Sequence, residues 1–89
     1  MLKPFFTKQF NKDVQRMKKR GKTFAAFKRI VAKLVNVEKL EPARRNHKLL
    51  GKFKNRLECH IEADWLLIYK RTKEEIIFER TGTHSDLFV

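Results

Sequence analysis

The sequence of residues 56–80 is RLECHIEADWLLIYKRTKEEIIFER, and three strand signals follow one another within it. Polar and apolar side chains alternate over residues 56–61, which is typical of a strand with one buried face. Residues 65–70 are apolar on both faces, as expected of a central strand, and residues 75–80 alternate again. The short polar connections between these segments suit hairpins. We therefore predict a three-stranded antiparallel meander.

The N-terminal half adds one strand and two helices to this meander. Residues 2–6 have the character of a short strand, and its proline restricts it to an edge or a strand start. Apolar side chains recur with helical spacing over residues 8–20 and 24–36, and the opposite side of each helix is basic. Thr7 and Thr23 are placed to cap these helices. We expect both apolar stripes to pack on the sheet, so that all 89 residues form a single α+β domain in which the strands share one sheet.

The positive charge of the chain is concentrated in its first part. Residues 1–54 hold 17 lysines and arginines against 3 acidic residues, whereas residues 55–89 hold 5 against 7, so balances of +14 and −2 give the net charge of +12. A domain this basic is expected to bind a polyanion, for which nucleic acid is the commonest choice. The alternative is an anionic membrane surface on which the two basic helices lie. No secretory signal or bilayer-length apolar run is present, so we expect a cytoplasmic protein without a membrane partner.

Cysteine and metal chemistry receive little support from the sequence. The single cysteine excludes an intrachain disulfide, and Cys59 alternates with apolar neighbours, which predicts a buried core position. The three histidines are 13 and 24 residues apart, a spacing that matches no zinc-ligand pattern. A glycine-rich phosphate loop, a nucleophile elbow and a dinucleotide fingerprint are also missing from the sequence. We therefore expect neither a metal nor a cofactor.

Polar side chains gather where the predicted strands end, and these are the candidate catalytic residues. His60 ends one strand and Asp64 opens the next across a tight turn, so we expect the two to be neighbours. Arg80 closes the last strand, and the glycine that follows lets the chain turn so that His84 folds back. Because alternate strand ends of a meander lie at one rim, all four should meet there. His47 is expected to join them from the basic connection that precedes the meander.

This set of groups is sufficient to cleave RNA. One histidine can remove the proton from a ribose 2′-hydroxyl, which attacks the adjacent phosphorus, while a second histidine protonates the departing 5′-oxygen. Arg80 can bind the phosphate and stabilise the charge of the transition state, and Asp64 can orient a histidine. RNA contacts are expected from two aromatic side chains that can stack on a base and from four basic side chains of the connection: Trp65, Phe88, Arg45, Lys48, Lys52 and Lys54.

The same residues also have purely structural interpretations. His60 can be a half-buried strand residue, His47 a loop residue and Trp65 a core residue. Arg80 can form a surface ion pair, and Asp86 can be a capping residue. The residues by themselves therefore predict a basic α+β domain that binds nucleic acid, and a nuclease is one of its possible functions.

Four segments in order resemble the RelE/ParE superfamily of toxins from bacterial toxin–antitoxin pairs, and specifically its YafQ-type branch. They are NHKL at 46–49, LGKFK at 50–54, CHIEADWLLIY at 59–69 and ERTGTHSDLF at 79–88. Each segment is weak alone, whereas four in this order and spacing are specific. The resemblance extends over nearly the whole chain and implies a RelE-like fold with the strand, helix, helix, three-strand order predicted above.

The resemblance implies a metal-independent mRNA endonuclease that cuts messages in the ribosomal A site and so inhibits translation. Messenger RNA and ribosomal RNA are then its partners. It further implies that His60 and His84 form the acid–base pair with assistance from Asp64. Arg80 then stabilises the phosphate, and His47 contributes to the pocket and to the positioning of RNA.

The resemblance also assigns roles to two aromatic residues and to a protein partner. Phe88 packs against a base, and Trp65 shapes the pocket beside the catalytic aspartate. The partner is a cognate antitoxin, typically with a ribbon-helix-helix DNA-binding end, in a toxin–antitoxin heterotetramer. A different class remains open: a non-catalytic protein, either a gyrase-directed toxin of the ParE type or an RNA-binding module, that does not need the histidines.

Overall fold

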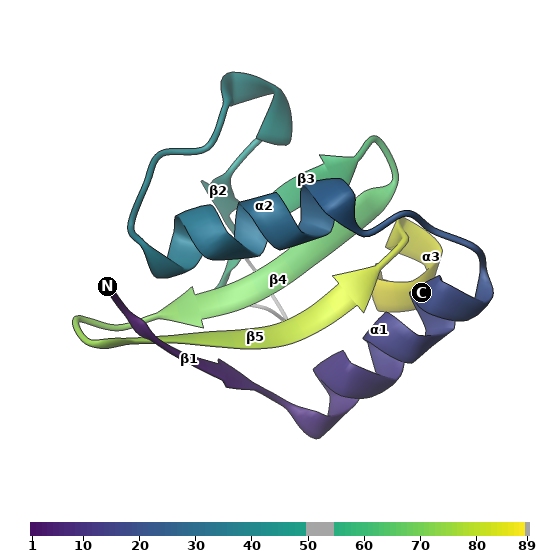
Figure 1. The fold of residues 1–89 in the computed structure, drawn as a ribbon, viewed down its shortest axis with the longest axis horizontal. Helices are drawn as coiled ribbons and strands as arrows, with labels where there is room; N and C mark the ends of the chain where they lie inside the picture. The colour runs from purple at the N-terminus through teal and green to yellow at the C-terminus, as the bar shows by residue number, and fades with distance from the viewer. Residues whose placement is uncertain (50–54, 89) are drawn as a thin grey trace.

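A five-stranded sheet with the order β1-β5-β4-β3-β2 forms the centre of the computed structural model (Figure 1). The structure describes residues 1–49 and 55–88. In chain order the elements are β1 (Lys3–Phe6), α1 (Lys8–Lys19), α2 (Ala25–Val35), the 3₁₀ helix η1 (Pro42–Arg44), β2 (His47–Lys48), β3 (Leu57–Glu62), β4 (Trp65–Arg71), β5 (Glu75–Gly82) and α3 (His84–Phe88).

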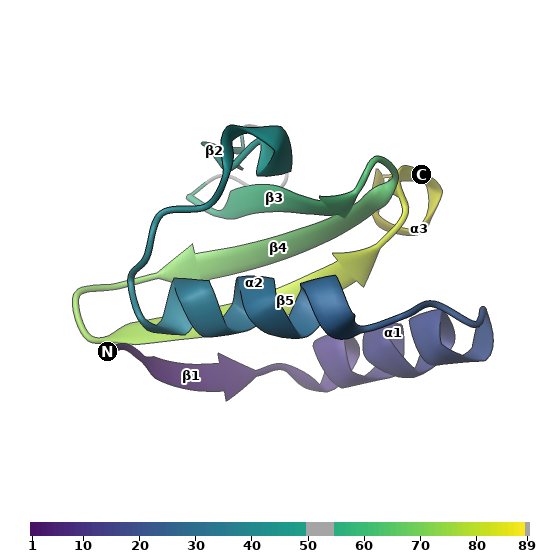
Figure 2. The same cartoon turned by 45° about the horizontal axis from the view of Figure 1, so that its top comes forward.

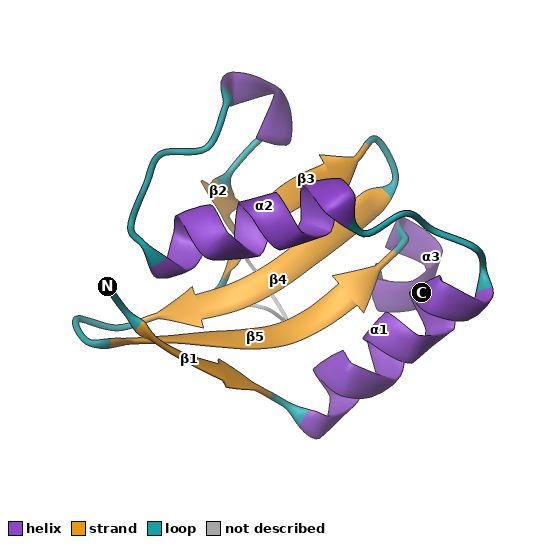
Figure 3. Ribbon diagram, in the orientation of Figure 1, coloured by secondary structure: helices purple, strands orange, loops and turns teal. Residues whose placement is uncertain are grey.

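The predicted meander and the predicted N-terminal strand are both confirmed. Strands β3, β4 and β5 are antiparallel neighbours, and β1 lies parallel to β5 at the edge of the sheet. Three short elements were not predicted: η1, the two-residue strand β2 that pairs with β3, and the C-terminal helix α3 (Figure 3). Each is too short for a hydrophobic period to be recognised in the sequence.

Helices α1 and α2 pack on one face of the sheet and enclose the main core (Figure 2). Phe10 and Met17 of α1 and Ile30 and Leu34 of α2 are buried, as the apolar stripes predicted. The strands supply the other side of this core from a set of inward-facing residues: Cys59, Ile61, Trp65, Leu67, Tyr69, Ile76 and Phe78. Within residues 1–49 and 55–88, no helix is both long enough and apolar enough to cross a membrane.

One of the two predicted helix caps is confirmed and the other is wrong. The hydroxyl of Thr7 accepts a hydrogen bond from the backbone N–H of Phe10 (3.0 Å), which caps α1. Thr23 does not cap α2, because Phe24 occupies the capping position and makes no side-chain capping bond. The ring of Phe24 packs edge-on against Phe27 and Trp65, with centroids 4.9 and 5.1 Å away. Aromatic packing therefore fixes the start of α2.

The opposite face of the sheet carries a second, smaller apolar cluster. Leu66 and Ile68 of β4 are completely buried there beneath Leu87 of α3, and Leu49 packs against the same cluster. Burial of these side chains holds two short segments onto this face: α3, and β2 through Leu49 directly after it. This second cluster places the candidate site, because both segments carry histidines.

Candidate active site

A buried glutamate joins two of the histidines on the face of the sheet opposite α1 and α2. Strand β2 lies beside β3 with His47 opposite Glu58, and Glu58 in turn lies opposite Ile68 of the smaller cluster. Nε2 of His47 and Nε2 of His60 are each 3.4 Å from the same Oε1 atom of Glu58. Glu58 is only 5% exposed, so its carboxylate is held in place between the two rings.

His84 continues this row from the first residue of α3. Its ring centroid is 6.0 Å from that of His60 and 6.2 Å from that of Phe88. Asp64, in the β3–β4 turn, accepts two hydrogen bonds from His84, one from the backbone N–H (2.9 Å) and one from Nδ1 of the ring (2.6 Å). These bonds lower the pKa of Asp64, which is therefore a carboxylate at neutral pH. The row thus runs from Phe88 through His84, His60 and Glu58 to His47.

Ionic contacts with α1 hold α3 in this position. Asp86 accepts hydrogen bonds from the guanidinium of Arg20 at 2.6 and 2.9 Å, and Arg16 lies 3.5 Å away. Asp86 also accepts from the backbone N–H of Thr83, whose hydroxyl accepts from the N–H of Asp86, so the two residues form a capping box. The bond from Arg20 is the main reason that the pKa of Asp86 is lowered. The capping interpretation of Asp86 is therefore confirmed.

The turn before α3 requires glycine at position 82. A Cβ atom there would lie 2.9 Å from Oδ2 and 3.0 Å from Cβ of Asp86. Asp86 has little room to yield, because Arg20 and Thr83 fix its carboxylate. The predicted turning role of this glycine thus has a steric basis.

Arg80 has a partner that the sequence did not suggest. Its Nε and Nη2 atoms donate to the two oxygens of Asp13 in α1, at 2.8 and 3.3 Å. Asp13 is completely buried and also accepts hydrogen bonds from the backbone N–H of Thr81 (3.1 Å) and from Gln9 (3.0 Å). In the sheet, Glu58 of β3 lies opposite Ile68 of β4, which in turn lies opposite Arg80 of β5. Asp13 therefore anchors this arginine at the margin of the histidine row.

The expected site residues are brought together only in part. His60 and His84 are neighbours, and the histidine that Asp64 contacts is His84. His47 joins through Glu58. Arg45, Lys48 and Phe88 are exposed, and Arg80 is anchored to Asp13. Lys52 and Lys54 lie outside the described residues.

The expectation that Trp65 stacks on RNA is wrong. Its side chain is completely buried on the helix side of the sheet, stacked on Phe27, and its Nε1 donates to the hydroxyl of Thr81 (2.9 Å). The structural interpretation of Trp65 as a core residue is confirmed. Cys59 is buried as predicted, and desolvation raises the pKa of its thiol to about 12, which leaves no thiolate nucleophile at neutral pH.

Glu58 is the site residue that the sequence interpretation missed. A signal was present, because strict alternation places Glu58 and His60 on the same face of one strand. Within the described part of the chain, no three side chains of the His, Cys, Asp and Glu types are arranged to hold a metal ion. The site is therefore an array of imidazoles, each with a carboxylate neighbour.

Among the described residues, two ring nitrogens of this array have no hydrogen-bond or ion-pair partner and are available for proton transfer. Nδ1 of His84 is occupied by Asp64, which leaves Nε2 of that ring. Nε2 of His60 faces Glu58, which leaves Nδ1. His47 is committed at both nitrogens, since Nδ1 lies 2.5 Å from the carbonyl oxygen of Arg45 and Nε2 faces Glu58. The geometry therefore provides two adjacent imidazoles that can act as base and acid.

Comparisons with known proteins agree over nearly the whole length of the chain. A family model described as the bacterial toxin of type II toxin–antitoxin systems, YafQ, matches residues 2–89. The mRNA interferase toxin YafQ of Escherichia coli K12 is 40% identical over 84 residues, which cover 93% of this chain and 91% of that protein.

Solved structures give the same result. The crystal structure of YafQ from E. coli BL21(DE3) superposes with a TM-score of 0.95 at 36% identity and covers 100% of both chains. The toxin in the E. coli DinJ–YafQ toxin–antitoxin complex superposes with a TM-score of 0.92 at 37% identity, covering 99% of this chain and 98% of that one. The chain therefore belongs to the YafQ family of bacterial toxins from type II toxin–antitoxin systems.

Proposed function

We propose that this chain is an mRNA interferase, an endoribonuclease that cuts messages in the ribosomal A site and so inhibits translation. The observation that carries the proposal is the pair of imidazoles of His60 and His84, whose centroids are 6.0 Å apart and each of which contacts its own carboxylate. The relative of 40% identity is itself named an mRNA interferase toxin, which supports the same activity. The chemistry uses side chains alone and needs no metal.

Cleavage begins at the ribose 2′-hydroxyl. One of the two free ring nitrogens removes its proton, the 2′-oxygen attacks the adjacent phosphorus, and the bond to the 5′-oxygen breaks as the other ring donates a proton to it. Asp64 holds the His84 ring with its Nδ1 proton toward the carboxylate, so that Nε2 faces the substrate. Arg80 stabilises the charge that develops on the phosphate oxygens.

Binding of RNA uses the exposed basic and aromatic side chains around the row. Phe88 is 45% exposed and lies beside His84, where it can stack on a base. The candidate phosphate contacts are Arg45, Lys48, Lys52 and Lys54. The basic outer sides of α1 and α2 are suited to ribosomal RNA, since a net charge of +12 favours a polyanionic partner. This function places the protein in the cytoplasm, where ribosomes are.

A cognate antitoxin is the second proposed partner. Two solved structures of relatives contain the E. coli DinJ–YafQ pair, and this chain covers 98 to 100% of those toxin chains. We propose an antitoxin with a ribbon-helix-helix end and a toxin–antitoxin heterotetramer. Acidic stretches of such a partner would relieve the self-repulsion of the toxin and stabilise its folded state by binding to it.

Induced expression in bacteria without the antitoxin tests the function. We expect growth arrest and messages with new 5′ ends inside coding regions, mapped by primer extension. Co-expression of the small protein encoded beside the toxin gene should suppress both effects. Growth arrest with DNA breaks and an SOS response, but without cut messages, would support a gyrase-directed toxin and contradict the proposal.

Replacing Glu58 with glutamine is expected to reduce message cleavage about 10-fold or more, because the neutral amide removes the negative charge that lies 3.4 Å from Nε2 of both His47 and His60. Glu58 is a positioning residue, so the change should also be visible without substrate. We expect the ¹⁵N chemical shifts of the His47 and His60 rings to change together. Glu62→Gln, on the same strand but paired with Lys22 at the surface, is the matched control and should leave both rings as they are. Unchanged ring shifts in Glu58→Gln would refute the role.

A further inference from the structure

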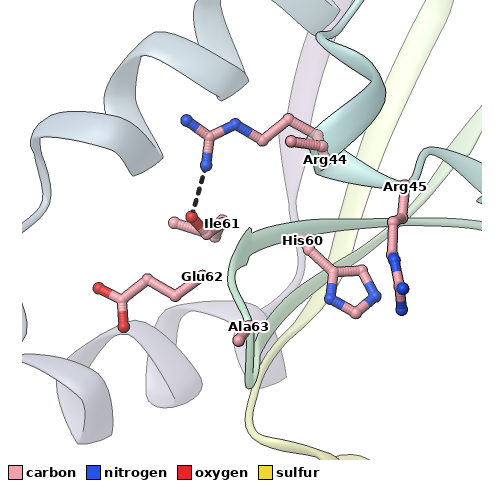
Figure 4. Close-up of a pocket in the computed structure, with 7 residues that line it drawn as sticks. Arg44, Arg45, His60, Ile61, Glu62 and Ala63 are labelled. Atoms are coloured by element: carbon pink, nitrogen blue, oxygen red, sulfur yellow. Dashed lines mark hydrogen bonds between the residues drawn. The ribbon is translucent and has the colours of Figure 1, made fainter.

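A cavity of about 380 Å³ opens beside His60, between η1 and the β3–β4 hairpin (Figure 4). Residues 43–45 form one wall and residues 60–63 form the other. Its volume is near the lower limit for small-molecule sites, so it suits one base or one nucleotide and no longer stretch of chain. Of its lining residues, the roles proposed above use only His60 and Arg45, and none of those roles gives the space itself an occupant.

The cavity is formed by the protein before any ligand arrives. The Nη1 group of Arg44 donates a hydrogen bond to the backbone carbonyl of Ile61 (2.7 Å), which ties η1 to the hairpin. Arg45 follows in the left-handed conformation (φ 51°, ψ 46°), and its backbone N–H donates to the carbonyl of Pro42 (3.1 Å). Its own carbonyl contacts the His47 ring. The segment that presents Arg45 is therefore fixed at both ends.

The two arginines of the cavity differ in what their side chains bind. Arg44 turns toward the hairpin, where it contacts Ile61 and lies 3.9 Å from a carboxylate oxygen of Glu41. Arg45 is exposed and forms no ion pair with any residue in the described ranges. Figure 4 shows its side chain extended in the same direction as the ring of His60. A charged guanidinium that has no anionic partner among residues 1–49 and 55–88 thus borders the cavity beside the ring of His60.

We propose that this cavity binds the nucleotide next to the scissile phosphate, with Arg45 on that nucleotide's own phosphate and its base against the wall formed by Ala43 and Ala63. The inference rests on the proposed cleavage of RNA. His60 lines both the cavity and the catalytic row, so a strand whose scissile phosphate lies at His60 has its neighbouring nucleotide within reach of Arg45. Guanidinium groups bind phosphate in bidentate fashion, and unpaired RNA offers a splayed base to such a pocket. The cavity then contributes to the choice of cleavage site.

Two variants test the cavity in cells, with cut 5′ ends mapped across all messages after induction. Arg45→Gln removes the charge, and we expect about tenfold fewer cuts at the wild-type sites. Ala43→Leu fills the cavity without a change of charge, and we expect a different nucleotide distribution beside the cut bond. Arg71→Gln, an equal loss of charge at the exposed far end of β4, is the control and should keep the wild-type pattern.

The cavity proposal is overturned if Arg45→Gln and Ala43→Leu both keep the wild-type frequency and pattern of cuts. It is also overturned if Arg71→Gln lowers cutting as much as Arg45→Gln does, because general attraction to RNA would then explain the loss. Failure of the proposed function has a different result, since the wild-type protein would then leave no cut messages. Arg45 is exposed, so the result for Arg45→Gln stands even if Ala43→Leu does not fold.

Discussion

Replacing His84 with alanine is expected to reduce message cleavage by about 10²–10⁴-fold, which is the usual contribution of one positioned acid or base. At that level we expect growth arrest to disappear. The side chain of His84 is 56% exposed, so its removal leaves no cavity in the core. Asp64 keeps its hydrogen bond from the backbone N–H of residue 84, so the β3–β4 turn stays attached to α3. The expected loss is therefore chemical, with an intact fold.

The measurement is the frequency of cut 5′ ends together with growth after induction. Ser85→Ala is the matched control, because it changes the next exposed residue of α3, which is not a member of the histidine row. The thermal unfolding midpoint of His84→Ala should lie within a few degrees of the wild-type value. Full toxicity of His84→Ala would show that the histidine row is not the active site.

The repeating elements of this fold were accessible to prediction because each buries one face with a regular period. Helical spacing located α1 and α2 to within a residue at most of their ends, and alternation located β3 and β5. Trp65 shows where this reasoning fails. Strand β4 is apolar on both faces, so its pattern does not say which face meets the helices and which meets α3. Only the packing of Phe24 and Phe27 against Trp65 decides it.

The convergence of His60 and His84 was predicted from the sequence, whereas the pairing of each ring with a particular carboxylate was not. Strand ends that share a rim follow from the order of the meander, and the distance between the two rings confirms that expectation. Which acid each ring contacts depends on side-chain conformations that the order of the strands does not determine. Asp64 was expected to lie near His60 and to orient a histidine that the sequence did not specify, and α3 brings His84 to it. Glu58 serves His60 from within its own strand.

The sequence contains a clear signal at Asp13, but the periodic spacing of apolar residues does not by itself explain it. It is the one acidic residue in the predicted helix 8–20, and it lies three residues after Phe10 and four before Met17, on the side of the apolar stripe. A carboxylate on that side needs a donor from another element. The structure supplies Arg80 and the backbone of Thr81, both 67 or more residues away in sequence. Such long-range pairs have no local pattern.

Replacing Asp13 with alanine is expected to lower the free energy of unfolding by about 3 kcal/mol, the largest stability loss of any single change proposed for this protein. The substitution removes four hydrogen bonds at once and leaves the N–H of Thr81 buried without an acceptor. It also leaves Arg80, whose side chain is only 24% exposed, without its counter-charge. In a domain of this size the thermal midpoint should fall by roughly 12–24 °C. Denaturation in the His84→Ala background, which permits expression, measures this loss.

Asp64→Ala in the same background is the matched control, since it deletes an identical group that is 62% exposed. Water can satisfy the groups that Asp64 leaves behind, so its effect on unfolding should be much smaller than that of Asp13→Ala. Asp13→Asn should fall between the two, because its amide oxygen still accepts from Thr81 while the charge opposite Arg80 is lost. If Asp13→Ala and Asp64→Ala unfold at the same temperature, Asp13 does not anchor β5. Burial distinguishes the two aspartates. The same chemical deletion leaves buried donors without an acceptor at Asp13, whereas water reaches the donors that Asp64 leaves behind.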